Sequence, residues 1–400
     1  MSEQLLYLSL ALILGFFMAK AVGRIRLPAV TGYLVAGLLL SLFRVIPMES
    51  LHGFSIISDV ALGFIAFSIG SEFKIDYLRE LGKGPIIIAL LESFGAVAVI
   101  FATLSLFKTP LVLTILLSAI GAATAPAATL MVVRQYKADG PVTRMLLPVV
   151  AMDDAVALIA FAIAAAVAQV LVGQSQLSFA AMVFKPLFEI GGALLLGGLL
   201  GLLLSLLMKQ VKHDSERLVF VFAFVFAAIG FSALLGVSTL LAGMALGSVY
   251  VNLSSQSMKT FRIADSITPP IFMLFFVLSG AELDLSIIRE IGLIGLIYVV
   301  GRVIGKYSGS LAGACLAKAP LVTRKYLGLT LVPQAGVAIG LSTLALRITP
   351  EYGSQIRTII LCATLIYELT GPVLTKMALT RAGEIKQPEK SVKANQFKVN

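Results

Sequence analysis

The 400-residue chain has few of the residues that build disulfide, metal or redox sites. It contains two cysteines and two histidines. Cys315 and Cys362 lie in separate apolar stretches, so neither a disulfide framework nor a metal site with the usual cysteine spacing is indicated. His52 and His213 lie in loops, which favours solvated side chains; a pH-sensing role for His213, which has charged neighbours, is the alternative. No cofactor is expected.

Charged residues are also scarce. They make up 13% of the chain, against 58% hydrophobic residues, and no long hydrophilic segment interrupts the apolar stretches. Stretches of about 17–25 apolar residues recur from end to end, which is the length needed to span a bilayer. The first lacks the basic segment that precedes a cleaved signal peptide. The expected spans are 4–22, 28–47, 56–71, 84–107, 110–133, 145–172, 180–208, 217–235, 237–251, 266–281, 290–317, 325–347 and 354–379. The sequence therefore predicts an all-α integral membrane protein with about 13 transmembrane helices.

The net charge of +10 is explained by topology, not by nucleic-acid binding. Most of the 31 Lys and Arg residues fall in alternate loops and in the C-terminal tail. Because cytoplasmic loops carry an excess of Lys and Arg, the N-terminus is expected outside and the C-terminus inside. The chain is thus expected in the inner or plasma membrane, with membrane lipids and no nucleic acid as partners. Only Arg302 and Lys306 are basic residues deep inside a span.

Two adjacent carboxylates, Asp153 and Asp154, lie in the middle of the sixth apolar stretch. A charged side chain at bilayer depth costs about 3 kcal/mol even on insertion scales. Neighbouring carboxylates also repel each other, which favours the binding of a proton or a cation at the pair. The pair is therefore interpreted as the centre of an ion-transport site.

The chain aligns with itself at an offset of 210 residues. Without a gap, Gly70, Glu72, Arg79, Glu80 and Gly82 coincide with Gly280, Glu282, Arg289, Glu290 and Gly292. One copy follows the third span and the other follows the tenth, so the two six-helix halves, joined by the seventh span, are expected in opposite orientation. Inverted-topology repeats are typical of secondary transporters, whose site lies near the midplane where the halves meet.

The same offset pairs the fifth span with the twelfth, and both contain residues that interrupt a helix. The broken-helix residues are Ala125 and Pro126 in the first half and Pro333, Gln334 and Gly336 in the second. By helix rise, both prolines lie about 12 Å from the inner boundary of the membrane. Freed backbone groups at that depth need protein or a water-lined cavity to satisfy them. We expect two broken helices that cross at the site; an ordinary proline kink in each is the alternative.

Helix rise also places Lys306 near the aspartate pair. Asp153 lies about 13 Å and Lys306 about 18 Å from the inner surface. Since adjacent helical residues point about 100° apart, one aspartate can face the lysine while the other faces the ion path. We assign Asp154 to the ion and Asp153 to Lys306. Thr124 is expected as a further cation ligand alongside freed carbonyl groups.

Other polar residues at depth receive structural interpretations. Arg302 is expected nearer the outer third, as an ion-pair or vestibule residue, and Glu368 is expected to pair with a basic group such as Arg302. Thr129 is expected to bond its own helix. Glu92 and Glu189 are interpreted as acids that are satisfied within the bundle or face the outer lipid interface. A role in transport is the alternative for these two residues and for Glu368, and Arg302 and Glu368 are the possible accessory residues of the site.

These motifs together resemble the monovalent cation:proton antiporters of the sodium/proton exchanger superfamily, in the bacterial second branch with paired aspartates. The resemblance covers the chain to about residue 380. It rests on residues 124–127, residues 151–155 around the aspartates, residues 305–309 around Lys306 and the turn at 280–284. One departure is the segment 334–336, Gln-Ala-Gly, where many relatives have Arg-Gly-Glu.

The resemblance implies a homodimer with a dimer part, at about 1–82 and 217–288, and a mobile core part, at about 84–172 and 290–380. The helix at about 180–208 would link them within a transmembrane domain of residues 1–380. The basic tail, 381–400, is too short for the nucleotide-binding domain of some relatives. Paired aspartates with Lys306 imply electrogenic exchange carried by an elevator-like motion.

The sequence thus predicts a transporter and not an enzyme, in which Na⁺ or a similar monovalent cation competes with H⁺ at Asp154. A K⁺/H⁺ antiporter is the alternative within the family. A sodium-coupled organic-solute symporter would need more polar side chains than the alanine-lined first break offers. An intramembrane aspartyl protease needs aspartates that face each other from different helices. A channel-like or sensory protein is a further alternative.

Overall fold

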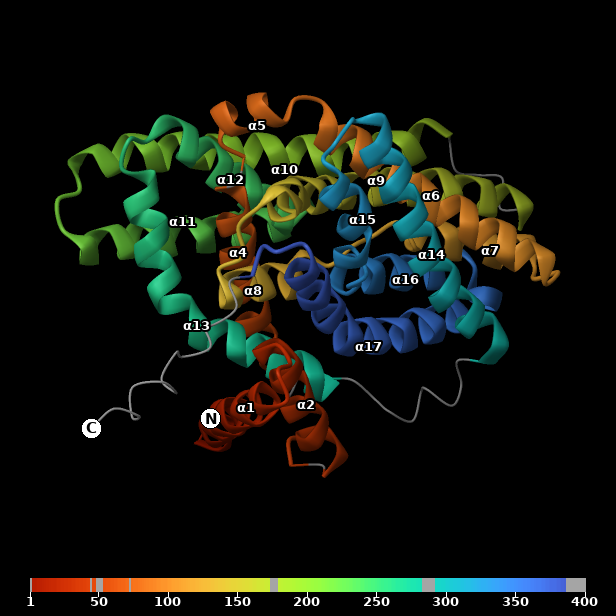
Figure 1. Cartoon of the computed structure of the whole chain (residues 1–400), viewed down its shortest axis with the longest axis horizontal. Coiled ribbons are helices and arrows are strands. Elements are labelled where there is room, and N and C mark those ends of the chain that lie inside the picture. Colours follow the sequence, from red (N-terminus) through yellow and green to blue (C-terminus); the bar gives the residue numbers. More distant parts are fainter. Residues whose placement is uncertain are drawn as a thin grey trace, which may run out of the picture.

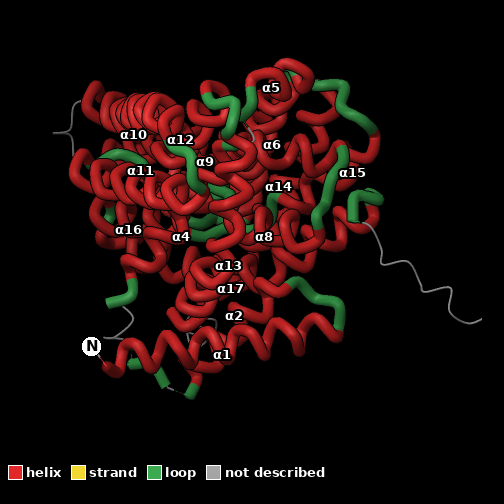
Figure 2. The backbone as a smooth tube through the Cα atoms, turned by 90° about the vertical axis from the view of Figure 1, so that its left-hand side faces the viewer, coloured by secondary structure: helices red, strands yellow, loops and turns green. Residues whose placement is uncertain are grey.

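The computed structural model describes residues 2–43, 45–47, 53–71, 73–172, 179–282 and 292–385. Within these residues the chain forms helices and connecting loops but no strand (Figures 1 and 2). Two predicted features extend beyond the described residues. The turn of the second repeat lies outside them at residues 283–291, and the basic tail lies outside them from residue 386 on.

A helix, or a pair of helices, occupies each of the thirteen predicted ranges. The first half contains α1 (Ser2–Arg24), α2 (Ala29–Leu42), α4 (Ser55–Gly70), α5 (Ile75–Leu81), α6 (Gly84–Leu106), α7 (Leu111–Ile120), α8 (Pro126–Tyr136) and α9 (Pro141–Leu171). The remainder contains α10 (Phe179–Leu207), η1 (Met208–Gln210), α11 (Asp214–Leu235), α12 (Thr239–Leu253), α13 (Ser257–Glu282), α14 (Gly292–Leu316), α15 (Leu321–Thr330), α16 (Gly336–Ile348) and α17 (Pro350–Arg381). Among the described helices, seven are long and apolar enough to cross a membrane by length and composition: α1, α6, α9, α10, α11, α13 and α17.

The internal repeat is visible in the backbone. The helices α7 and α15 have the same length, and the breaks that follow them, residues 121–125 and 331–335, are separated by 210 residues. The same offset relates three pairs of residues with positive φ: Arg26 and Gly236, Gly82 and Gly292, and Lys108 and Lys318. The repeat that five identical residues suggested is therefore also present in the backbone conformation of the loops and in the positions of helix ends.

Helices α6 and α14 pack antiparallel and unusually close. Glycines at every fourth position of α14 face α6, so the two backbones come into contact. A Cβ atom at Gly305 would lie 2.6 Å from Ala96 Cα, and one at Gly309 would lie 2.8 Å from Glu92 Cα. Small residues at such spacing let membrane helices approach closely. This contact brings the polar residues of α6 and α14 to the same level.

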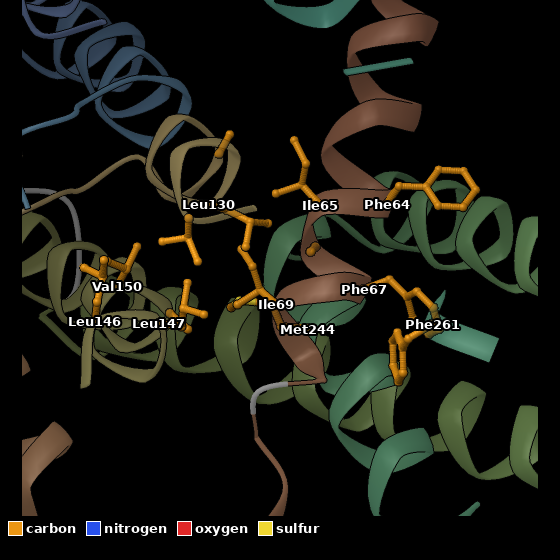
Figure 3. Close-up of a cluster of buried hydrophobic side chains, with 14 of the residues drawn as sticks. Phe64, Ile65, Phe67, Ile69, Leu130, Leu146, Leu147, Val150, Met244 and Phe261 are labelled. Carbon is orange, nitrogen blue, oxygen red and sulfur yellow. The ribbon is translucent and has the colours of Figure 1, made fainter. Parts of the chain in front are cut away.

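The buried apolar side chains form three clusters. One, around Leu40 and Val277, belongs to α1, α2 and α13, and another, around Ile120 and Ile360, belongs to α6, α7, α9, α14, α16 and α17. The third joins these regions through α4, whose Ile65 points toward α8 and α9 while its Phe64 lies on the other side of the helix (Figure 3). Much of the boundary between the predicted dimer and core parts therefore consists of packed aliphatic side chains.

Candidate ion-binding site

The two helix breaks meet in the interior. Ala125 N donates a 2.9 Å hydrogen bond to the Pro333 carbonyl oxygen, which joins the first break to the second. Pro126 is the first residue of α8, where its lack of an N–H costs nothing, and Gly336 is the first residue of α16. The breaks therefore lie at both predicted positions, and each leaves carbonyl groups that no helix satisfies.

Arg302 on α14 satisfies carbonyl groups of both breaks. Its Nε donates to Gly121 O at 2.9 Å, and its two Nη atoms donate to Ala123 O and Val332 O at 2.6 Å each. Its guanidinium carbon lies 4.7 Å from the centre of the Tyr367 ring. These carbonyls follow the C-terminal ends of α7 and α15, where a positive charge is favourable. A guanidinium suits this position because its donors form a planar fork.

Gln334, in the second break, also bonds a carbonyl at the first break. Its side-chain nitrogen donates to Ile120 O at 3.1 Å and lies 3.0 Å from the Tyr298 hydroxyl. The side chain is fully buried. The residue that departs from the family pattern is thus a neutral hydrogen-bonding group that also satisfies the end of α7.

Lys306, one turn after Arg302, is surrounded by oxygen atoms. Its Nζ lies 2.7 and 2.9 Å from the two carboxylate oxygens of Glu92, 2.6 Å from Ala122 O and 2.7 Å from Thr124 Oγ1. Asp153 Oδ2 is farther away, at 3.3 Å. Lys306, Glu92 and Asp153 are all fully buried.

Asp153 is held by neighbouring hydroxyl groups. Thr124 Oγ1 donates to Asp153 Oδ2 at 2.7 Å and accepts from Lys306, so it bridges the two charged groups. Ser93 Oγ lies 3.0 Å from Glu92 Oε1 and 3.4 Å from Asp153 Oδ1. The structure therefore places the predicted ligand Thr124 between Asp153 and Lys306.

Asp154 differs from its neighbour in having no such partners. Its side chain is 1% exposed, and neither carboxylate oxygen forms a hydrogen bond with any residue that the structure describes. A buried carboxylate without a donor is costly when ionised, and a bound proton or cation removes that cost. The geometry thus separates Asp153, next to the lysine, from Asp154, whose carboxylate oxygens have no hydrogen-bond partner among the described residues.

The charges at the crossing do not balance when all groups are ionised. Lys306 and Arg302 supply two positive charges, and Glu92, Asp153 and Asp154 supply three negative charges. The described part of the chain places no carboxylate within ion-pair distance of Arg302, whose donors bind carbonyls. One bound monovalent cation or one proton would make the cluster neutral.

Three structural interpretations from the sequence, which concern Arg302, Glu368 and Thr129, are wrong. Arg302 lies at the crossing and not in a vestibule, and it does not pair with Glu368, one of whose carboxylate oxygens, Oε1, accepts no hydrogen bond from any described residue. Thr129 does not bond its own helix but donates to Thr330 O, in the other half of the chain, at 3.2 Å. For Arg302 and Thr129, carbonyls at a helix end, which have no helical partner, accept from these side chains.

Of the two structural interpretations of Glu92, the structure agrees with an acid satisfied within the bundle, but sequence reasoning missed its partner, Lys306. The four-residue spacing of Gly301, Gly305, Gly309 and Gly313 could have identified α6 as the close neighbour of α14. Lys306 adjoins that glycine row, so an acid on the facing helix is its natural counter-charge. Tyr298, which contacts Gln334, was also missed.

Comparison with known proteins identifies the family. The family model described as "Sodium/hydrogen exchanger, transmembrane" matches residues 8–380. The chain belongs to the sodium/hydrogen exchanger family. The predicted membership is therefore confirmed, and it makes the protein a transporter of the membrane and not a member of an enzyme class. No protein of curated function matches the sequence.

Solved structures share the fold. The sodium proton antiporter MjNhaP1 from Methanocaldococcus jannaschii at pH 8 superposes with a TM-score of 0.74 and 19% identity, over 96% of this chain and 99% of that one. An electron-microscopy structure of the same antiporter gives a TM-score of 0.79 at 19% identity, over 97% and 100% of the two chains. At this identity the likeness concerns the fold of the sodium/hydrogen exchanger family alone.

Proposed function

We propose that the chain is a secondary active antiporter that exchanges Na⁺, or a similar monovalent cation, for H⁺ at Asp154 and Asp153. The observation that carries this proposal is the buried, unpartnered carboxylate of Asp154 beside the helix crossing. Family membership and the fold shared with a sodium proton antiporter support it.

In this mechanism a proton and a dehydrated cation compete for the aspartate pair. Asp154 receives the ion directly, and Asp153 joins it by loosening its 3.3 Å contact with Lys306. Because two carboxylates can load two protons but only one sodium ion, the pair favours electrogenic exchange. Whichever ligand is bound crosses the membrane as the site opens first to one side and then to the other.

The moving element in this proposal is the core part, at about 84–172 and 290–380. It would shift as an elevator against a homodimer built by residues of about 1–82 and 217–288, with the helix at about 180–208 as linker. Support comes from the cluster around α4, in which the two predicted parts meet through apolar side chains. A multi-pass position in the inner or plasma membrane follows from the same proposal.

Exchange in proteoliposomes tests the site. Asp154→Asn should abolish Na⁺ uptake driven by a pH gradient, because the amide removes the charge that binds the cation. The matched control is Asp139→Asn, an exposed acid paired with Arg144 at 3.1 Å, which should retain exchange. Retained uptake in Asp154→Asn would contradict the assignment. Parallel assays with K⁺ and Li⁺ determine which cation the site accepts.

A further inference from the structure

The nearest charged partner of Lys306 is Glu92, not Asp153. Both carboxylate oxygens of Glu92 lie within 2.9 Å of the ammonium nitrogen, whereas Asp153 Oδ2 lies at 3.3 Å and also accepts from Thr124. The ammonium has three N–H donors, and five oxygen atoms from four residues lie within 3.3 Å of its nitrogen. Asp153 can therefore leave without exhausting the partners of the lysine.

The backbone holds Glu92 and Lys306 in a fixed relation. Gly305 and Gly309 on α14 touch the backbone of α6 at Ala96 and Glu92. The two helices therefore cannot approach more closely, and separating them would break this contact. Ser93 Oγ adds a 3.0 Å contact to Glu92 Oε1. Asp153, by contrast, reaches the lysine from a third helix, α9.

We infer that Glu92 is a positioning residue that holds the Lys306 ammonium throughout the exchange cycle and so leaves Asp153 free to bind the transported ion. This inference rests on the proposed exchange at Asp153 and Asp154. A buried charge that loses its only partner is strongly unfavourable. If Asp153 were the only carboxylate near Lys306, every cation that bound Asp153 would have to displace the lysine from it.

The groups that face Lys306 support this division. Glu92 approaches from α6, the Ala122 carbonyl and Thr124 from the first break, and Asp153 from α9. Arg302, the other buried basic residue of α14, donates to backbone carbonyls and does not bind Glu92. Glu92 is thus available to the lysine alone among the basic groups described at the crossing.

The test compares the half-saturating Na⁺ concentration of Glu92→Gln with that of the wild type in proteoliposomes. Without the Glu92 charge, Lys306 competes with Na⁺ for Asp153, so the half-saturating concentration should rise by about tenfold or more. The control, Glu189→Gln, removes the same charge from the half-buried Glu189 of α10 and should stay near the wild type. An unchanged half-saturating concentration in Glu92→Gln would overturn the inference.

The double variant Glu92→Gln with Lys306→Gln separates this role from a purely structural one. Removing the competing ammonium should bring the half-saturating Na⁺ concentration back to the wild-type value or below it. A structural role would leave the double variant at least as impaired as Glu92→Gln, and that result would overturn the inference. If Glu92→Gln alone does not fold, the double variant decides. A double variant that folds and exchanges Na⁺ supports the inference, and a double variant that also fails to fold overturns the inference.

Failure of the inference is distinct from failure of the proposed function. The proposed function is refuted if the wild type shows no Na⁺/H⁺ exchange or if Asp154→Asn retains exchange. The inference fails when wild type and Asp154→Asn behave as proposed while the Glu92 variants do not.

Discussion

Arg302 and Lys306, one helical turn apart on α14, satisfy different groups at the crossing. Arg302 donates to three carbonyls that the helix breaks leave free, and Lys306 neutralises carboxylates. The difference follows from their chemistry, since a guanidinium binds several acceptors in one plane whereas an ammonium acts as a compact point charge. The two side chains are therefore not interchangeable, although both are buried cations of one helix face.

Replacement of Arg302 tests its structural role. Arg302→Gln should leave at least one buried carbonyl without a donor, because an amide has only two N–H donors, and lower the free energy of unfolding by about 1–3 kcal/mol. Arg302→Lys should recover only part of that loss, because an ammonium cannot reach all three carbonyls. Thermal unfolding of purified protein in detergent measures both, with Arg262→Gln, at an exposed position of α13, as the control. A melting temperature for Arg302→Gln equal to that of the control would refute this role.

At the scale of elements, the close pair of α6 and α14 determines the geometry of the site. The two helices are held together by backbone contact along the glycine row of α14. Because Glu92 and Lys306 lie on these facing surfaces, their separation depends on how closely the helices pack. A methyl group added at the contact should therefore affect stability and exchange together.

Gly309→Ala tests this dependence. Its new Cβ would lie 2.8 Å from Glu92 Cα, so the helices must move apart, at a cost of about 1–3 kcal/mol in the free energy of unfolding. Na⁺/H⁺ exchange should also fall, because the shift separates Glu92 from Lys306. Gly198→Ala on α10 is the matched control, since a Cβ there has open space. The thermal stability and exchange of the two variants should differ; equal values for the two would count against the packing argument.

For the whole molecule, the internal repeat has a consequence for orientation. Lys108 and Lys318 occupy equivalent loops, with φ of 54° and 53°. If the halves are inverted in the membrane, these equivalent residues lie on opposite sides of it. Parallel halves would place them on the same side.

Cysteine labelling distinguishes the two arrangements. In a background without Cys315 and Cys362, Lys108→Cys should react with a membrane-impermeant maleimide from the outside and Lys318→Cys only from the inside. The matched backbone conformations make each variant the other's control. Right-side-out and inverted vesicles provide the measurement, and labelling of both positions from one side would exclude inverted repeats.

The sequence by itself determined the class of the protein, the approximate helix ranges, the two breaks and the nearness of Lys306 to Asp153. These features depend on local chemistry and one-dimensional spacing: the length of apolar stretches, the missing N–H of proline, the 210-residue offset and the rise of a helix. The family was also recognisable from short motifs around Pro126 and the aspartate pair. None of these features requires knowledge of how the helices pack.

Only the tertiary structure decided which polar groups meet. Depth along one helix does not specify which face of a neighbour lies opposite, so Glu92 could not be assigned to Lys306 nor Arg302 to the carbonyls of both breaks. The expected Arg302–Glu368 pair failed for the same reason. Hydrogen bonds require atoms within about 3 Å, and such distances arise only when close packing, here along the glycines of α14, fixes one helix against another.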